Sequence, residues 1–333
     1  MSLPVSIVIP VHNGRDLLEK LLASIHRQTA APLEVIVVDN GSTDGAAACA
    51  RLAGAKVIEM GRNCGFAAAV NRGIREARGE GVALINSDVE LDSLWLEALW
   101  NAARAHGWDF ATGKILQAGP GDLMDGSFDL ISRGACSWRA GAGRPASEFA
   151  EAAREVRFCS ATAAIYLSEL FRSVGLFEEA FESYLEDVDF GLRCAAAGRK
   201  GGYFPMAKCR HRGSATLGRW NPRVVRLLAR NQVWLVARHY SPQLTRRWLW
   251  PIVVGQLLWG TLALRHGCAI AWLRGKTEGL VGFRAVRQAA PTCSELAPVI
   301  AESEREIHRL QSPAGGDAYW RFYFRFAGVA KEP

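Results

Sequence analysis

Residues that could bind a cation or accept a proton gather at two places in this 333-residue chain. The first is Asn86-Ser87-Asp88, which directly follows an apolar run at 81–85. A carboxylate that ends a buried strand lies at the sheet edge where ligands bind, and it suits a divalent cation held against a diphosphate. The second is Glu186-Asp187 with Asp189, at the predicted start of a helix. Acids favour a first helical turn, but three exceed what the helix dipole needs.

The elements that position these residues follow an alternating pattern. Short apolar, β-branched runs predict strands, and the segments between them have the apolar spacing of helices. The predicted strands are 5–11, 33–38, 56–60 and 81–85, and the clearest helices are 16–28 and 67–78. Repeated strand–helix alternation predicts an α/β fold whose mostly parallel sheet is covered by helices on both faces.

Pro10 and a series of polar residues accompany the ends of these strands, and the polar ones are, in order, Asn13, Asp39, Asn63, Asn71 and Asp88. Asp39 could accept hydrogen bonds from a base or a ribose hydroxyl, and Asn63 with the backbone near Gly65 could face a base or a phosphate. Any one of them could equally cap a helix or make a turn. Their recurrence at four strand ends favours a ligand site.

Two common nucleotide-binding patterns are missing from the sequence. No G-x-G-x-x-G follows the first strand, which disfavours a dinucleotide enzyme. Gly275-Lys276-Thr277 resembles the end of a phosphate-binding loop, but Ile270 stands where the upstream glycine is required. A P-loop enzyme is therefore disfavoured as well.

Composition narrows the class of protein further. The hydrophobic content is 49% and the charged content 22%, as in globular proteins. A net charge of +7 suits a nucleotide-linked substrate, an anionic membrane or a nucleic acid. Lysines and arginines are not interleaved with aromatics in a nucleic-acid module, so we expect no nucleic-acid partner. The eight cysteines are scattered without a C-x-x-C pair, which predicts free thiols in a reducing compartment.

Four segments together resemble family 2 glycosyltransferases, most closely a bacterial rhamnosyltransferase-like branch. They are VSIVIPVHN (5–13), VVDNGSTD (37–44), NCGFAAAVN (63–71) and LINSDV (84–89), and the resemblance covers about residues 4–215. It implies a GT-A fold, a nucleotide-diphosphate sugar donor, inversion at the anomeric carbon and a divalent cation, Mg²⁺ or Mn²⁺. For the donor it points to dTDP-rhamnose or another dTDP- or UDP-sugar.

The resemblance also implies roles for particular residues. Asp187 matches the family's catalytic base, while Asp88 and His211 match positions that reach the metal. We expect the remaining contacts to the diphosphate or the acceptor to come from Arg212, Glu186 and Asp129. The expected donor-binding residues are Pro10, Asn13, Asp39, Asn63, Gly65, Phe66, Asn71, Asn86 and Ser87.

One departure from the family pattern concerns the metal motif, which often has two acids around one residue. Here Asn86 takes the place of the first acid. The cation would then depend on donor phosphates and water for its remaining ligands. The alternative is a nucleotide-sugar-binding scaffold with a decayed site.

The sequence predicts a catalytic domain at 1–220, with a nucleotide-sugar half at about 1–115 and an acceptor half at about 116–220. A helix is expected at 91–105, with further strands at 110–115, 158–167 and 202–209. Residues 117–150 are expected to form a long loop, which the family resemblance places beside the acceptor. Its outer part, 140–150, could instead be a disordered surface insertion.

Residues 221–333 predict a helical, membrane-associating region. The segment 248–264 is uncharged but lies at the lower length limit for a bilayer span, and arginines flank it. Trp248, Trp250, Trp259 and Trp272 suit the headgroup zone. We favour helices lying in the membrane interface over burial in a homo-oligomer or against the catalytic domain, and over a true span. Without signal-peptide features at its start, the protein is expected in the cytoplasm, at the cytoplasmic face of the inner membrane.

Overall fold

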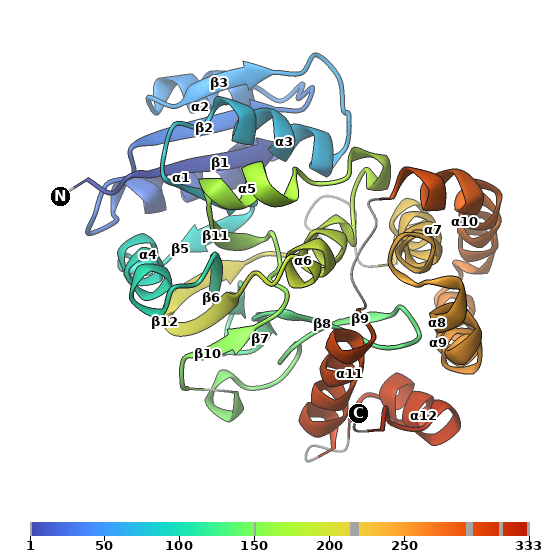
Figure 1. Ribbon diagram of the computed structural model, residues 1–333. Coiled ribbons are helices and arrows are strands. Elements are labelled where there is room, and N and C mark those ends of the chain that lie inside the picture. Colours follow the sequence, from blue (N-terminus) through green and yellow to red (C-terminus); the bar gives the residue numbers. More distant parts are fainter. Residues whose placement is uncertain (1, 150, 214–219, 291–295, 313–315, 332–333) are drawn as a thin grey trace. The chain divides into compact units, whose positions relative to one another are not determined.

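The computed structural model describes residues 2–149, 151–213, 220–290, 296–312 and 316–331, and the chain divides into two compact units (Figure 1). Unit 1 comprises Met1–Phe128, Gly141–Cys194 and Gly198–Thr216. Unit 2 comprises Asp129–Ala140, Ala195–Ala197 and Leu217–Pro333. The functional division of the chain at residue 220 stays a prediction.

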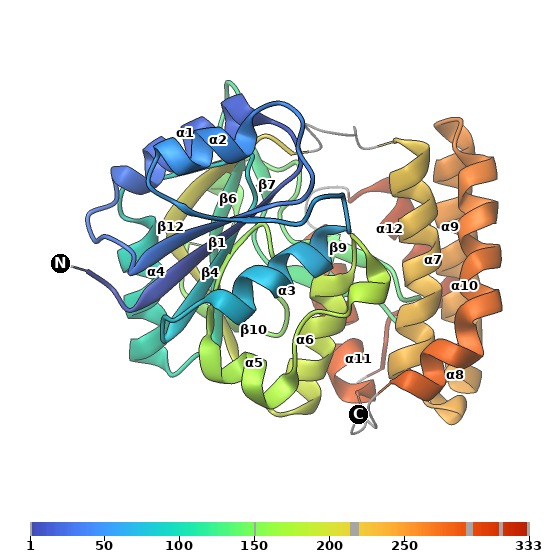
Figure 2. The same ribbon diagram turned by 90° about the horizontal axis from the view of Figure 1, so that it is seen from above.

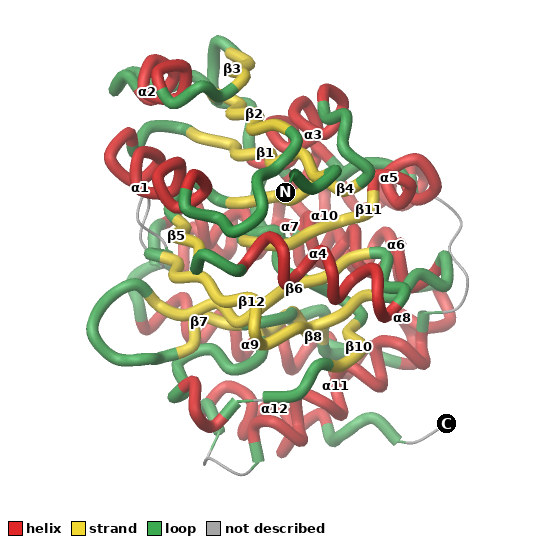
Figure 3. The backbone as a smooth tube through the Cα atoms, turned by 90° about the vertical axis from the view of Figure 1, so that its left-hand side faces the viewer, coloured by secondary structure: helices red, strands yellow, loops and turns green. Residues whose placement is uncertain are grey.

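Unit 1 is built on a sheet of ten strands in the order β10-β12-β6-β11-β4-β1-β2-β3, with β5 paired to β12 and β7 to β6. The strands are β1 (Val5–Val11), β2 (Glu34–Asp39), β3 (Lys56–Glu59), β4 (Gly81–Ile85), β5 (Val89–Leu91), β6 (Phe110–Gln117), β7 (Met124–Gly126), β10 (Arg154–Val156), β11 (Ala163–Leu167) and β12 (Gly201–His211). Figure 3 shows these strands as the yellow segments of unit 1.

The predicted parallel arrangement is confirmed for β4-β1-β2-β3, where Val11 of β1 lies beside Asp39 of β2. The sheet as a whole is mixed, because β11 runs antiparallel to both neighbours, β4 and β6. Strands β1–β4, β6 and β12 nevertheless share one direction. Their carboxyl ends therefore meet at one edge, where ligands bind in such sheets.

Helices cover both faces of this sheet, as predicted (Figure 2). Helices α1, α2 and α4 contribute buried residues to the core on one face. On the other face, α3 lies close enough that a side chain at Gly73 would collide with Val8 and Val38. The helices of unit 1 are α1 (Arg15–His26), α2 (Ala46–Leu52), α3 (Phe66–Glu76), α4 (Trp95–His106), α5 (Ser168–Val174) and α6 (Glu186–Ala196), with 3₁₀ turns η1 (Ala146–Glu148) and η2 (Glu179–Phe181).

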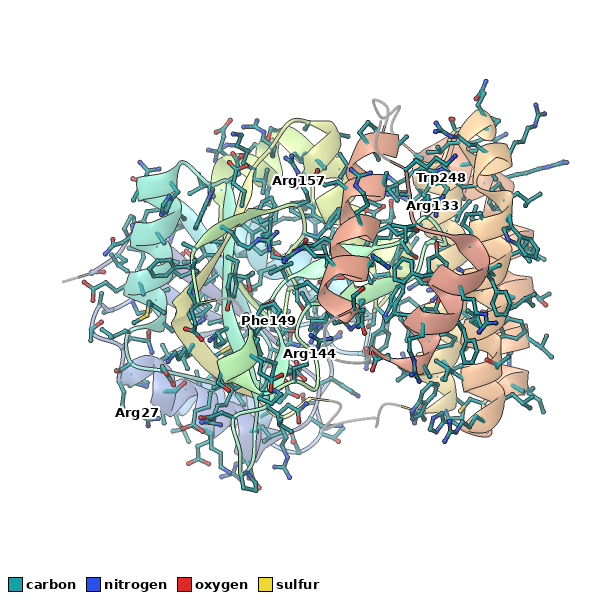
Figure 4. All side chains as sticks on the ribbon, turned by 90° about the horizontal axis from the view of Figure 1, so that it is seen from below. Arg27, Arg133, Arg144, Phe149, Arg157 and Trp248 are labelled. Carbon is teal, nitrogen blue, oxygen red and sulfur yellow. The ribbon has the colours of Figure 1, made fainter. Side chains whose placement is uncertain are left out.

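Two predictions of local structure were wrong. The helix expected from residue 91 begins only at Trp95, because Val89–Leu91 pairs with β12 as β5. The region 117–150, expected as a long loop, contains β7 and two further strands, Asp129–Ile131 and Ser137–Arg139, which belong to unit 2. Its outer part is not a surface insertion, since Phe149 is buried and packs against Phe128 and Tyr203. Figure 4 labels Phe149 and Arg144, which both belong to this segment.

Unit 2 is mainly helical, as predicted. Its elements are the hairpin β8 (Asp129–Ile131) and β9 (Ser137–Arg139) and the helices α7 (Pro222–His239), α8 (Pro242–Arg247), α9 (Leu249–Arg265), α10 (Ala269–Ala289), α11 (Ala297–Gln311) and α12 (Ala318–Ala327). The side chains of Asn221 and Ser241 cap the starts of α7 and α8. The hairpin is joined to α11 by a hydrogen bond of 2.7 Å from Ile131 N to Ser303 Oγ.

The membrane-facing predictions for unit 2 are partly revised. Within the described ranges, no helix is long and apolar enough to cross a bilayer. Trp248 is buried against Tyr240, and Trp259 and Trp272 are half-buried beside Val225. Of the four tryptophans expected at headgroups, Trp250 alone is exposed. The seven cysteines that the structure describes are free thiols, as predicted, and Cys293 lies outside the described residues.

Candidate active site

The ends of β1 and β2 are tied into one polar loop. Asp39 is buried at the end of β2, and both of its carboxylate oxygens accept the Ser42 N–H, at 3.2 and 3.3 Å. Asn13 follows β1 in a left-handed conformation, with φ of 61°. Its Oδ1 accepts the Thr43 N–H at 2.9 Å. Asp39 and Asn13, both predicted to contact the nucleotide-sugar donor, thus shape one loop at the sheet edge.

Asn40 organises the neighbouring turn at residues 63–66, a role that the sequence analysis missed. Its Oδ1 accepts the Cys64 N–H at 2.8 Å, and its Nδ2 donates to Asn63 Oδ1 at 3.2 Å and to Gly65 O at 3.1 Å. Asn63 Oδ1 also accepts the Gly65 N–H at 3.0 Å. The available signal was its place directly after Asp39 at a strand end. The predicted donor residues Asn63 and Gly65 are therefore held in one geometry.

The turn at 63–66 is locked to the segment that precedes α6. Gly65 has a φ of 91°, and a Cβ there would lie 2.8 Å from Glu182 O. Only glycine tolerates both this conformation and so close an approach. Two hydrogen bonds complete the contact, from Ala67 N to Glu182 O at 3.0 Å and from Phe66 N to Ser183 Oγ at 3.2 Å.

This segment is itself strained. Glu182, Tyr184 and Leu185 all have positive φ, between 61° and 71°. Side chains other than glycine rarely adopt this region, and it occurs often at functional sites. The turn leads directly into α6, so its geometry fixes where the acids of the first helical turn lie.

Among those three acids, the structure separates the predicted base from its neighbours. Asp189 is fully buried and pairs with Arg193 at 3.0 Å. Glu186 is also buried. Asp187 is half-buried, and its Oδ1 accepts the N–H of Val188 at 2.9 Å. Asp187 is thus the accessible acid of the three, as a general base must be.

Two adjacent residues connect Asp187 with the metal motif. The Ala161 N–H lies 3.5 Å from Asp187 Oδ2, and the Thr162 carbonyl accepts the Asn86 N–H at 2.9 Å. Residues 159–163 are all small (Cys-Ser-Ala-Thr-Ala) and buried. The predicted base and the end of β4 therefore border the same short segment.

The carboxylate of the metal motif, Asp88, lies against His211. Antiparallel pairing of β12 with β5 places His211 opposite Val89. His211 Nε2 lies 3.2 Å from Asp88 Oδ1, and the Asp88 carbonyl accepts the N–H of Arg212 at 3.0 Å. The side chain of Arg212 is exposed. Asp88, Ser87 and Asn86 are half-exposed at this edge.

A further acid, Asp125 of β7, binds the opposite nitrogen of His211. Nδ1 of His211 lies 2.9 Å from Asp125 Oδ2. Burial lowers the pKa of His211, but its hydrogen bonds to Asp125 and Asp88 and the charges of both raise the pKa to about 9. The sequence analysis missed Asp125, because nothing local distinguishes it from other loop acids.

The chemistry of these side chains fits a divalent cation. The imidazole of His211 and the carboxylate of Asp88 are suitable ligands, and Asn86 Oδ1 is buried without a hydrogen-bond partner in the described part of the chain. An unsatisfied buried oxygen needs a partner. No group of three or more His, Cys, Asp or Glu within the described ranges is arranged as a metal site. An ion would therefore depend on ligands from the donor or water.

Three residues that were predicted to contact the donor or the acceptor, Asn71, Pro10 and Asp129, have their side chains in other environments. The Asn71 amide is engaged with Phe177 O and N, at 2.8 and 3.0 Å, and with Glu179 Oε1 at 3.0 Å. This argues against a donor-binding role. Pro10 is buried within β1. Asp129 belongs to unit 2 and lies 3.7 Å from Arg139, so its proposed contact with the acceptor has no support here.

Comparisons with known proteins identify the class. Residues 6–175 match the family model described as glycosyl transferase family 2, which is more than half of the chain. The chain is 30% identical over 226 residues to the N-acetylglucosaminyl-diphospho-decaprenol L-rhamnosyltransferase of Mycobacterium tuberculosis, covering 61% of this chain and 74% of that protein. It is 32% identical over 115 residues to a cholesterol galactosyltransferase of Borreliella burgdorferi, covering 33% of this chain and 32% of that protein.

Solved structures share the fold. GalNAc-T7 with UDP, GalNAc and Mn²⁺ superposes with a TM-score of 0.61 at 15% identity, covering 92% of this chain and 57% of that one. TarS of S. aureus gives 0.50 at 16% identity, covering 86% of this chain and 55% of that one. The present chain thus spans just over half of each structure. Fold and site define a GT-A enzyme, and the chain belongs to glycosyl transferase family 2.

Proposed function

We propose that this glycosyltransferase moves a sugar from a nucleotide-diphosphate donor to a glycan or lipid-linked glycan acceptor, with inversion. The observation that carries the proposal is the pair of contacts that place Asp187 beside Ala161 and Asn86 beside Thr162. A base and a cation-binding edge on one short segment suit a single displacement at a sugar between them.

In this mechanism Asp187 takes the proton from the acceptor hydroxyl as that oxygen attacks the anomeric carbon. The bond from that carbon to the diphosphate oxygen breaks, and the nucleoside diphosphate leaves from the opposite face. A bound Mg²⁺ or Mn²⁺ would supply charge stabilisation to the departing diphosphate. Asp88, His211 and Asn86 would hold it, and the exposed guanidinium of Arg212 would add a second positive charge.

We assign Asp125 the role of a positioning residue. Its hydrogen bond to Nδ1 directs Nε2 of His211 toward Asp88. Carboxylates that fix a histidine in this way tune metal ligation. Asp39, Asn13 and the 63–66 turn would bind the nucleotide, with Asn40 holding that turn.

The relatives support the substrate class. One is named for transfer of L-rhamnose to a decaprenol-linked acceptor, and the GalNAc-T7 structure contains UDP and Mn²⁺. We therefore propose dTDP-rhamnose, or another dTDP- or UDP-sugar, as donor, and a location at the cytoplasmic face of the inner membrane. The substitution of an acid by Asn86 supports one alternative, a nucleotide-sugar-binding scaffold with a decayed site.

Calorimetry with a panel of nucleoside diphosphates, with and without Mg²⁺ or Mn²⁺, tests the proposal. We expect one nucleotide to bind at micromolar affinity, more tightly with metal. Asp88→Ala should abolish the metal effect, whereas Glu90→Ala, an exposed acid two residues away, should preserve it. Binding without metal dependence would transfer leaving-group stabilisation to Arg212 and His211. Absence of nucleotide binding would overturn the proposal, and binding without sugar transfer would favour the scaffold.

A further inference from the structure

Two helices of unit 2 expose apolar side chains along one face each. Leu257 of α9 is 58% exposed and Leu280 of α10 is 66% exposed. Spacings of one, three, four and seven residues place the members on a single face of each helix. The exposed apolar side chains are Leu249, Trp250, Val253, Leu257 and Leu264 of α9 and Ile270, Leu273, Leu280 and Val281 of α10. We call this set the α9–α10 face.

The opposite faces of these helices are fixed inside unit 2. Gly275 and Gly279 bring α10 so close to α7 that a Cβ would lie 2.2 Å from Arg226 O and 2.8 Å from Val233. Gln256 of α9 donates to Gly134 O at 2.7 Å. Figure 2 shows α7, α9 and α10 running side by side. Because close packing and a hydrogen bond hold the inner faces, the α9–α10 face cannot turn inward without breaking them.

Positive charge surrounds this face. Residues 241–290 contain seven lysines and arginines and a single acid, Glu278, so they carry a formal charge of +6 in a chain of +7. Glu278 is engaged by Arg226 and Arg274, each at 3.2 Å. The side chains of Arg246, Arg247, Arg265 and Arg284 are exposed. Leucines beside arginines complement a surface that is apolar below and anionic above.

We propose that the α9–α10 face docks on the anionic surface of a lipid bilayer, with its apolar side chains at the level of the acyl boundary. The inference rests on the proposed membrane location but not on the identity of the donor. Helix α9 has 17 residues, about 26 Å at 1.5 Å per residue, short of a full span. A symmetric contact with a second copy would bring the arginines of both copies together, which disfavours that occupant.

Vesicle flotation of the full chain tests the proposal. Vesicles of phosphatidylcholine alone are compared with vesicles that also contain phosphatidylglycerol, at low and high salt. We expect binding to the anionic vesicles only, weakened by salt. The double variant Leu257→Glu/Leu280→Glu and the variant Arg265→Glu/Arg284→Glu should each bind roughly tenfold more weakly. The matched controls in unit 1, at exposed Leu52 and Lys20, are Leu52→Glu and Lys20→Glu, which should bind like wild type.

Circular dichroism and nucleotide calorimetry on the same samples separate the outcomes. Folded variants that bind vesicles as tightly as wild type would overturn the proposal. So would a wild-type protein that binds no anionic vesicle, or a concentration-dependent dimer that Leu257→Glu/Leu280→Glu dissociates. Loss of nucleotide binding in wild type would instead overturn the proposed function and leave the vesicle result intact.

Discussion

One carboxylate of unit 2, Glu304, and one of unit 1, Asp88, differ in how many hydrogen bonds the protein supplies to them. In unit 2, Glu304 is completely buried and accepts hydrogen bonds from Arg133 N and Nε, at 2.8 and 2.7 Å, from Tyr323 at 2.7 Å and from Ala330 N at 3.1 Å. In unit 1, the Asp88 carboxylate is 16% exposed and meets one side chain in the described part of the chain, His211. The neighbouring Asn86 Oδ1 has no hydrogen-bond partner there.

This difference distinguishes a carboxylate that stabilises the fold from one that can bind a ligand. A buried charge whose hydrogen-bonding capacity is filled by the chain needs no further ligand, and it fixes local geometry. A cluster with remaining capacity at a sheet edge is incomplete until something binds. Glu304 thus reads as a structural joint between the β8–β9 hairpin and the helices of unit 2, and Asp88 as part of a site.

The largest effect is expected from Asp187→Asn. Without a base for the acceptor hydroxyl, turnover should fall roughly 10²- to 10⁴-fold, while nucleotide affinity stays unchanged. Rate assays with the donor identified by calorimetry measure this. Asp189→Asn provides the contrast in the same helical turn, because it breaks the buried pair with Arg193 and should lower stability instead. Near wild-type turnover in Asp187→Asn would remove the base assignment.

Glu304→Ala should have the next largest effect, and on stability alone. It leaves the charge of Arg133 poorly compensated, since that side chain is only 14% exposed. Breaking a buried pair costs about 3–5 kcal/mol of the free energy of unfolding. Urea titration measures the loss, and nucleotide calorimetry on the folded variant should match wild type. A loss of nucleotide affinity without a loss of stability would mean that Glu304 serves ligand binding and not the structure of unit 2.

The sequence predicted the parts of the site that local patterns encode. Asp39 and Asp88 end apolar runs, and Asp187 begins a helix, so each position could be inferred from its own segment. Asn40 and Asp125 could not, because their roles depend on partners at 63–65 and 211 that only folding brings close. The same reason explains β5, three residues long and defined only by its pairing with β12. The hydrogen bond from Asn71 to Phe177 could not be inferred from the motif for the same reason.

Asp125→Asn should have an intermediate effect on the site. The amide can still accept a hydrogen bond from His211, but the negative charge that orients the imidazole is lost. We expect Mn²⁺ affinity in the presence of nucleotide to fall about 10- to 100-fold, with metal-free nucleotide affinity unchanged. Calorimetry and Mn²⁺ electron paramagnetic resonance measure it. Asp122→Asn is the control, since Asp122 is exposed and pairs with Arg210 at 2.8 Å. Equal Mn²⁺ affinity in both variants would restrict Asp125 to a structural role.

The smallest effect is expected for Lys276 of unit 2, a third charged side chain to compare with Glu304 and Asp88. Its Nζ donates to Ala229 O and Gln232 Oε1, each at 2.9 Å, and to Gln256 Oε1, all neutral oxygens. Burial lowers the pKa of Lys276 from 10.5 to about 7. Between these values Lys276 binds more protons in the unfolded chain than in the folded one, so its contribution to the free energy of unfolding should rise with pH.

The contribution of Lys276 should rise by at most about 1.4 kcal/mol per pH unit between pH 7 and 9. His211, whose pKa is raised to about 9, contributes in the opposite direction over the same range, so the effect of Lys276 is measured against a variant that lacks its charge. Urea titrations of wild type and of Lys276→Met at several pH values measure it. The free energy of unfolding of wild type relative to Lys276→Met should rise with pH, while the site of unit 1 is unaffected in both proteins. A stability difference between wild type and Lys276→Met that stays constant over this range would mean that the three oxygens stabilise the ammonium as fully as the four donors stabilise Glu304. Lys276 would then be a second satisfied charge of unit 2.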